Sequence, residues 1–184
     1  MPDRIAILGW GSLLWDPRPA FDQWHGTWQD DGPLLKIEFS RISTSRAGAL
    51  TLVLDSSSGA DIQVAHCLSL RSDLSQVIDD LRLREGTTTG NIGYIRRNGQ
   101  SRSRDRQVRT VIGAWMAMHA FDAVVWTDLQ SNFAERTGKP FSVDVALAYL
   151  QSLSEEGCRA ASEYITKAPD FVDTPLRSEL RAAA

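Results

Sequence analysis

Hydrophobic and polar positions along the chain predict strands in its first part and helices after them. Ile5-Ala6-Ile7-Leu8 is a continuous apolar run that ends at glycines, which is typical of a buried strand entering a tight turn. Between residues 35 and 41 apolar and polar side chains alternate, as they do on a strand with one buried face. Two more strands are expected at residues 50–54 and 62–70, and an antiparallel meander is the simplest way to pair them.

Helical spacing begins after Ser72, a suitable N-cap residue, and we expect this helix to end at Glu85 because Gly86 follows. Further on, the pattern predicts a strand at 92–96, a helix at about 108–119, a strand at 123–126, and helices at 142–153, at 155–167 and from Thr174-Pro175. Strands followed by helices indicate an α+β fold rather than a regularly alternating parallel sheet. We expect residues 1–184 to form a single domain, since this length is usual for one hydrophobic core.

Composition narrows the classes of protein that fit. The formal net charge is −3 and the isoelectric point is near 5.6, so no global attraction to nucleic acid or to anionic membranes is expected. Cys67 and Cys158 stand far apart without the spacing of metal ligands, which argues against a zinc site and a disulfide framework. No apolar run has the length of a membrane span or of a secretory signal. We therefore predict a cytoplasmic protein with no metal ion, no nucleic-acid partner and no membrane partner, and the oligomeric state is left open.

Glu85 is the first candidate for chemistry. It lies four residues after Leu81 on the predicted helix, on the stripe that should face the core. Burial and the negative end of the helix dipole would both raise the pKa of a carboxyl group there, which suits a general base. The alternative is that the last turn frays and that Glu85 points into water, paired with Arg82 or Arg84.

The loop Gly9-Trp10-Gly11-Ser12-Leu13 is the second candidate. Its two glycines follow a strand, as in a dinucleotide-binding fingerprint, but the third glycine position is Leu14, and two prolines soon break the helix that would hold a pyrophosphate. What remains is a glycine turn whose backbone N–H groups could bind a carboxylate or another small anion. The alternative is a tight turn beside a buried Trp10. Ser12 lacks the surroundings of a hydrolase nucleophile and is expected to bind a ligand at most.

The remaining polar residues fit structural roles. His119 shares the apolar face of its helix, so we expect a core histidine rather than a catalyst. Asp128 follows the strand at 123–126, where a structural turn is the expected role. Arginines between positions 96 and 109 form a basic cluster in a polar segment, either a solvated loop or a contact for an anionic ligand.

Three segments point together to one family. The loop from Gly9 to Leu13 is similar to a Gly-Tyr-Gly-Ser-Leu loop, and Asp80-Leu81-Arg82-Leu83-Arg84-Glu85 is similar to a helix end that carries a catalytic glutamate. Between them stand residues of a segment with an Arg-Gly pair, although Ala47 interrupts the pair here: Phe39, Ser43, Arg46, Gly48 and Thr51-Leu52. These segments, in this order, resemble the gamma-glutamylcyclotransferase-like proteins, including their ChaC branch. The resemblance covers the first half of the chain.

The resemblance implies a small mixed β-barrel flanked by helices. It also implies a reaction in which the α-amine of a gamma-glutamyl substrate attacks its own γ-carbonyl, releasing 5-oxoproline and an amine or amino acid. Glu85 would be the acid/base group, the loop from Gly9 to Leu13 would bind the α-carboxylate and amine, and Arg46 would take part in substrate binding. The nucleophile belongs to the substrate, so the resemblance implies no cofactor.

One departure from the family pattern affects the function. The family's Tyr is Trp10 here, which replaces a hydroxyl group by an indole N–H donor. The substrate therefore stays open among glutathione, a gamma-glutamyl dipeptide and another gamma-glutamyl amide. The change also motivates a hypothesis from a different class, a noncatalytic module that holds a carboxylate ligand on the same fold. Residues that bind the leaving group are expected between Arg96 and Asp128.

Overall fold

The computed structural model describes residues 2–183, and its chain divides into two units. Unit 1 contains the chain up to Gly9, Asp16–Leu35 and Gln63–Leu129. Unit 2 contains Trp10–Trp15, Lys36–Ile62 and the chain from Gln130 onward. The chain passes between the units five times, so neither unit is one continuous segment. A single domain over residues 1–184 stays a prediction.

Unit 1 is built on a five-stranded sheet with the strand order β5-β1-β8-β6-β7. The strands are β1 (Ile5–Gly9), β5 (Ala65–Leu68), β6 (Ile92–Arg96), β7 (Ser101–Arg102) and β8 (Ala123–Thr127). β1 runs parallel to β8, whereas the other neighbouring pairs are antiparallel. Every residue of β1 is buried, which explains why this strand has no polar side of its own.

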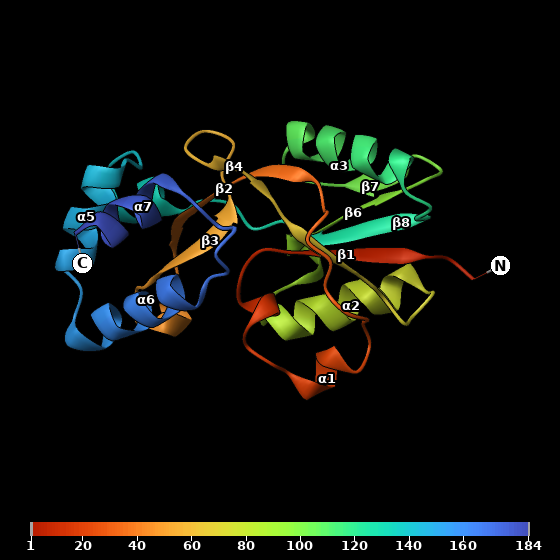
Figure 1. Ribbon diagram of the computed structural model, residues 1–184, viewed down its shortest axis with the longest axis horizontal. Coiled ribbons are helices and arrows are strands. Elements are labelled where there is room, and N and C mark those ends of the chain that lie inside the picture. The colour runs from red at the N-terminus through yellow and green to blue at the C-terminus, as the bar shows by residue number, and fades with distance from the viewer. Residues whose placement is uncertain (1, 184) are drawn as a thin grey trace. The chain divides into compact units, whose positions relative to one another are not determined.

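Two helices cover opposite faces of this sheet, α2 (Leu74–Glu85) and α3 (Arg106–Met118), as Figure 1 shows. On the α3 face, a Cβ atom on Gly113 would lie 3.1 Å from the side chain of Ile95, so Ile95 points toward α3. Gly93 lies on the same face of β6 two residues earlier and is paired with Trp126 of β8. A Cβ atom on Gly93 would lie 2.3 Å from the Trp126 ring, so the buried indole requires glycine opposite it.

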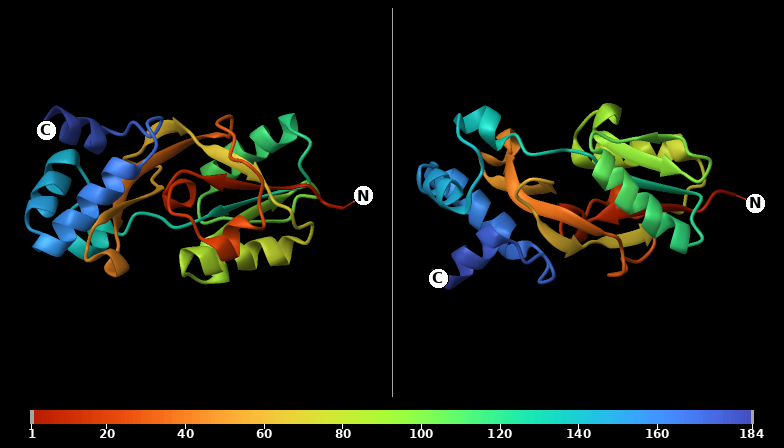
Figure 2. Two further views of the ribbon diagram at one scale, coloured as in Figure 1. Left: turned by 60° about the horizontal axis from the view of Figure 1, so that its bottom comes forward. Right: turned by 90° about the horizontal axis from the view of Figure 1, so that it is seen from above.

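Unit 2 is built on a three-stranded sheet with the order β3-β2-β4. Its strands are β2 (Leu34–Ile42), β3 (Leu50–Leu54) and β4 (Ala60–Gln63), and the first and last of these extend slightly into unit 1. Four helices follow in the second half of the chain, α4 (Phe133–Thr137), α5 (Val143–Gln151), α6 (Glu155–Lys167) and α7 (Pro175–Ala182). α6 packs against β3, and α5 contacts both α6 and α7, so the blue helices form one layer on this sheet (Figure 2).

The α+β class is confirmed, but the expected strand pairing is wrong. The apolar run at 62–70 forms two strands, because β4 pairs with β2 whereas β5 pairs with β1. Val64 lies between them and donates its N–H to the carbonyl oxygen of Pro33, at 3.1 Å. The sheet of unit 1 has β5 and β7 at its edges and the sheet of unit 2 has β3 and β4, so neither closes into the expected barrel within residues 2–183.

Helix ends follow the predicted signals closely. Ser142 and Thr174 are N-caps, and each side chain accepts a hydrogen bond from a backbone N–H of the first turn. The N-cap of α2 is Asp73 rather than the expected Ser72, and its carboxylate accepts from the Ser75 N–H at 2.9 Å. α2 ends at Glu85 as expected, because Gly86 adopts the left-handed conformation with φ of 61°.

Candidate functional site

Glu85 lies on the inward-facing side of α2 in unit 1. Val77 and Leu81 of the same stripe are buried, and the Glu85 side chain, one turn further, is only 20% exposed. Its Oε1 atom is fully buried and stands 3.7 Å from Nη1 of Arg84. The sequence leaves open whether Glu85 points inward or into water, and in the structure it points inward. The ion pair with Arg84, which was expected only for the outward orientation, forms nevertheless.

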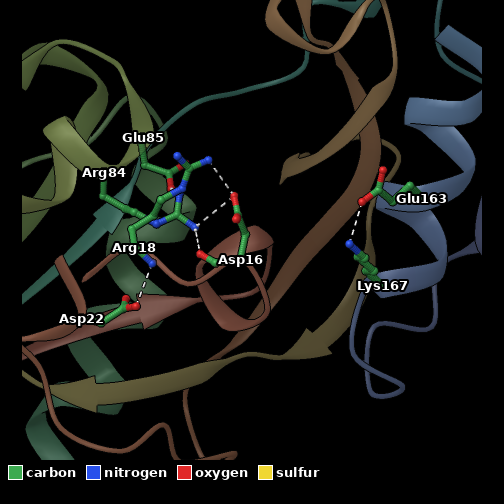
Figure 3. Close-up of polar contacts among 7 residues, drawn as sticks. All are labelled: Asp16, Arg18, Asp22, Arg84, Glu85, Glu163 and Lys167. Atoms are coloured by element: carbon green, nitrogen blue, oxygen red, sulfur yellow. Dashed lines mark hydrogen bonds and ion pairs between the residues drawn. The ribbon is translucent and has the colours of Figure 1, made fainter. Parts of the chain in front are cut away.

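Arg84 connects the end of α2 to Asp16, the first residue of the segment Asp16–Leu35 of unit 1 (Figure 3). Its side chain is only 4% exposed, and Nη2 donates to the carbonyl oxygen of Asp16 at 2.8 Å. Arg18 pairs with the Asp16 carboxylate at 2.9 Å and donates its backbone N–H to Asp22. Arg84 therefore places a buried positive charge at the negative end of the helix dipole, beside the Glu85 carboxylate.

The end of α2 lies at the same edge of the unit 1 sheet as the end of β8. The Asn91 side chain donates to Thr87 Oγ1 at 2.8 Å, just after α2, and the Asn91 carbonyl accepts from the Asp128 N–H at 2.8 Å, just after β8. β1 runs parallel to β8 and ends at this edge with Gly9. The carboxyl ends of parallel strands are where ligands bind in many open sheets, so Gly9 and Glu85 of unit 1 share a favourable edge.

The opposite end of α2 borders a groove of about 740 Å³ in unit 1. Its lining includes Ser72 and Ile78 near the start of the helix, together with Tyr94 and Arg96 of β6. Because β6 and β8 are antiparallel, Arg96 stands opposite Ala123 at the start of β8. The groove thus lies along α2 and β6, and its lining also includes Thr89, four residues after Glu85.

The glycine loop continues in unit 2, where it forms a short 3-10 helix at Ser12–Leu14. Trp10 is buried, as the alternative explanation of the loop expects. Gly11 precedes the helix with φ of −115°, outside the left-handed range that favours glycine. A Cβ atom at position 11 would lie 3.0 Å from the Tyr164 hydroxyl, so a side chain there would require the tyrosine to shift. Trp15, directly after the loop, packs edge-on against the Tyr164 ring.

Arg46 approaches the same tyrosine from the other predicted segment of unit 2. Its guanidinium carbon lies 5.1 Å from the centre of the Tyr164 ring, a cation–π contact. Arg46 ends a 3-10 turn, and both Ala47 and Gly48 follow with positive φ, of 51° and 85°. The left-handed conformation is unfavourable for alanine, and the turn is held by a hydrogen bond from Tyr149 to the Gly48 carbonyl at 2.8 Å.

Tyr164 is a residue of the candidate site that sequence reasoning missed. It belongs to α6 and is 6% exposed, its hydroxyl lies close to Gly11, and Arg46 lies over its ring. In the sequence it stands with Ala161 and Ile165 on the apolar stripe of an amphipathic helix, so its pattern indicates a core residue. The structure thus brings the loop residue Gly11 together with Arg46 in unit 2, whereas Gly9 and Glu85 belong to unit 1.

The histidines of unit 1 lie in an aromatic cluster. His66 contacts Trp115, His119 and Phe121, and its Nδ1 stands 3.1 Å from the Asp31 carboxylate. Burial lowers the pKa of His66, while the Asp31 charge partly opposes that effect. His119 stacks on Trp115, and its Nδ1 lies 2.8 Å from the Trp115 carbonyl oxygen, which is the structural role expected from the sequence.

Two buried carboxyl groups also have structural partners. Asp128 accepts hydrogen bonds from the Arg104 N–H at 2.5 Å and from the Trp126 indole at 3.1 Å, and burial raises its pKa. This agrees with the turn role expected for Asp128. In unit 2, Glu38 accepts from the Phe39 N–H at 2.7 Å and from the N-terminal turn of α7, and burial raises its pKa as well.

The predicted arginine cluster is largely engaged within unit 1. Arg96 pairs with Asp3 at 2.7 Å, Arg102 donates to the Ile92 carbonyl and contacts the Tyr94 ring, and Arg104 donates to Asn91. These contacts hold Arg96, Arg102 and Arg104 within unit 1, and whether the cluster binds an anionic ligand stays a prediction.

Within residues 2–183, no three side chains of His, Cys, Asp or Glu converge as metal ligands would. None of the helices described over the same range combines the length and apolar character that crossing a membrane requires.

No protein-family model and no curated protein sequence matches the chain. Among solved structures, the chain is similar to the crystal structure of a selenomethionine-labelled gamma glutamyl cyclotransferase from yeast, specific to glutathione. The two share 13% sequence identity with a TM-score of 0.43 over 97% of this chain and 95% of the other. At this TM-score the similarity does not establish a shared fold.

Proposed function

We propose that this protein is an enzyme of the gamma-glutamylcyclotransferase type, which cyclises a gamma-glutamyl amide to 5-oxoproline and releases an amine or amino acid. The observation that carries the proposal is the place of Glu85. A glutamate with a buried oxygen ends α2 at the sheet edge where β1 ends in Gly9, the first residue of the loop with the family-like sequence. A partly buried carboxylate beside a buried arginine, at an edge of the sheet where ligands often bind, is a candidate for a chemical role.

The proposed reaction needs little covalent chemistry from the protein. The substrate's α-amine nitrogen bonds to its own γ-carbonyl carbon, and the bond from that carbon to the leaving nitrogen then breaks. The ring nitrogen of 5-oxoproline keeps one hydrogen, so the α-ammonium group loses two protons, and the leaving nitrogen gains two as it becomes an ammonium group. Glu85 carries these protons from the first nitrogen to the second. Holding the substrate folded for ring closure can contribute about 7 to 11 kcal/mol to the lowering of the barrier.

The contacts of unit 2 support a substrate-binding role for the loop and Arg46. The Arg46 guanidinium lies over the Tyr164 ring, and the hydroxyl group of the same tyrosine lies close to Gly11. In the proposal, Arg46 and the N–H groups of the loop bind the α-carboxylate of the gamma-glutamyl group. Trp10 replaces the tyrosine that the family has in this loop, so the loop itself has lost a hydroxyl group. In the proposal, the Tyr164 hydroxyl supplies a polar group beside the loop instead.

We further propose that the protein resembles the ChaC branch in its substrate, which would be glutathione or a gamma-glutamyl dipeptide. We propose that it acts in the cytoplasm. The support for the ChaC branch is the Arg46 segment and the Arg84-Glu85 pair, whose sequences resemble that branch. Variants in each unit can test the role of Glu85 and the role of the unit 2 residues separately.

The decisive experiment measures 5-oxoproline by mass spectrometry after incubation with glutathione, gamma-glutamyl dipeptides and gamma-glutamyl amines. We expect product from at least one substrate, and loss of that product in Glu85→Gln with the fold unchanged by circular dichroism. Glu156→Gln, the same chemical change at an exposed position of α6, should keep full activity. Full activity of Glu85→Gln would contradict the role of Glu85, and no product from any substrate would contradict the reaction.

A second candidate function is a noncatalytic receptor for a carboxylate ligand. It is favoured by the Arg46 and Tyr164 contact, which lies wholly in unit 2 and does not involve Glu85. A ligand that raises the melting temperature and remains chemically unaltered on long incubation would support the receptor. Conversion of that ligand would exclude it.

A further inference from the structure

Thr127 is the last residue of β8, and its side chain points to the face of the sheet that α2 covers. The Trp126 ring packs on the opposite face, against Gly93. Ile95 and α3 lie on this same face of the sheet. Successive residues of a strand point to opposite faces, so Thr127 faces α2. Its threonine side chain is stiff about χ1, and the ladder with Ile92 fixes the strand on which it stands.

The Thr127 hydroxyl is buried without a hydrogen-bond partner among residues 2–183. A buried donor or acceptor left unsatisfied destabilises a fold by about 1–3 kcal/mol, and valine would fill the same space in a strand without that loss. Such a group therefore calls for an explanation, and a role toward a ligand is one.

Thr127 lies at the same edge of unit 1 as Glu85. Asn91 forms one hydrogen bond to Thr87, two residues after Glu85, and another from Asp128, the residue after Thr127. Strands β1 and β8 run parallel with Ile7 opposite Val125, so Gly9 of β1 and Thr127 of β8, each two residues further along, lie at the same edge. The edge thus carries a buried carboxylate oxygen, a buried hydroxyl group and the start of the glycine loop.

We propose, resting on the function proposed above, that the Thr127 hydroxyl donates a hydrogen bond to the γ-carbonyl oxygen of the substrate. As the α-amine nitrogen bonds to the γ-carbon, the carbonyl electron pair moves onto this oxygen. The pair returns when the bond to the leaving nitrogen breaks, and that nitrogen takes the two protons that Glu85 carries from the attacking nitrogen. A donor that faces the oxygen from a site with little water stabilises the charge that develops there.

The test compares two substitutions at position 127 with one elsewhere. Thr127→Val removes the hydroxyl and keeps the shape, whereas Thr127→Ser keeps the hydroxyl. Ser40→Ala is the matched control, because Ser40 of β2 is also a fully buried hydroxyl without a partner among the described residues, but it lies in unit 2. The readouts are kcat and KM for 5-oxoproline release and the melting temperature of each protein.

We expect Thr127→Val to lower kcat by roughly 10²-fold, with a smaller change in KM and with a melting temperature equal to or above that of the unaltered protein. Thr127→Ser should retain most of the activity, and Ser40→Ala all of it. Unchanged kcat in Thr127→Val would overturn the inference and leave the proposed function standing. Equal losses in Thr127→Val and Thr127→Ser would also overturn it, because shape rather than the hydroxyl would then matter. No 5-oxoproline from the unaltered protein would overturn the proposed function itself, and this inference with it.

Discussion

The hydroxyl of Tyr164 lies 3.0 Å from the point where a Cβ atom of residue 11 would stand. Helix α6 therefore restricts the space at this position of the loop after β1, so a side chain in place of glycine would require Tyr164 to shift. Arg46 packs on the same ring. A loop and a turn that are distant in the sequence are thus held by one side chain of a helix more distant still.

This relationship predicts that Gly11→Ala destabilises the protein by about 1 kcal/mol, since a tight contact must be relieved by a shift of the tyrosine. Tyr164→Phe removes the hydroxyl that the new methyl group would meet. The alanine should therefore cost less in the Tyr164→Phe background, and urea unfolding of both single variants and the double variant measures the coupling. Equal costs of the alanine in the two backgrounds would show that the hydroxyl does not set the restriction.

Gly93→Ala is predicted to be far more damaging. Its Cβ atom would lie 2.3 Å from the ring of Trp126, which is fully buried and held by Asp128, so overpacking should cost about 3 kcal/mol. Gly90→Ala is the control, because its nearest neighbour would stand at 3.8 Å. Thermal unfolding and near-ultraviolet circular dichroism report stability and the tryptophan environment. Similar melting temperatures for the two variants would contradict the packing described for Trp126.

The stability of unit 1 should depend on pH through His66. Burial lowers its pKa below the ordinary 6.5, so in acid the unfolded chain binds the proton more readily than the folded one. The contribution of His66 is complete above pH 6.5 and is lost as the pH falls from there toward the lowered pKa. We expect His66→Gln to remove this part of the acid sensitivity in urea unfolding series.

The comparison must use the difference between the two proteins, because Glu38 acts in the opposite direction. Its raised pKa makes the folded state favour the proton, so its effect on stability declines as the pH rises above 4.5. Parallel stability curves for the unaltered protein and His66→Gln would contradict the assignment to His66.

Local signals in the sequence were sufficient for most single elements. The apolar run of β1, the caps Ser142 and Thr174, and the stop at Gly86 each depend on a few neighbouring residues, and the structure has all of them. The end of α2 is the useful case, because it places Glu85 correctly on the inward stripe. The same reasoning missed the break at Val64, where no glycine or proline marks the change of sheet.

Features that depend on distant partners were not predictable. Tyr164 has the spacing of a core residue, and only the packing of α6 reveals its contacts with Gly11 and Arg46. The orientation of Thr127 likewise follows from the pairing of Gly93 with Trp126, which depends on strand order. A single sequence records which residues are apolar or polar, but the partner of each strand is set by the whole fold.

The five passages of the chain between the two units determine how this protein can be cut or exchanged. A fragment ending at Leu129 would carry all of unit 1, but it would also carry Trp10–Trp15 and Lys36–Ile62 without the helices α4 to α7 that complete unit 2. The remaining fragment would have those helices and no sheet to pack on. Neither half is therefore a candidate for separate expression, and recombination at one crossover point could not replace either unit cleanly. The effect of a sequence change on folding therefore has to be measured in the full-length chain.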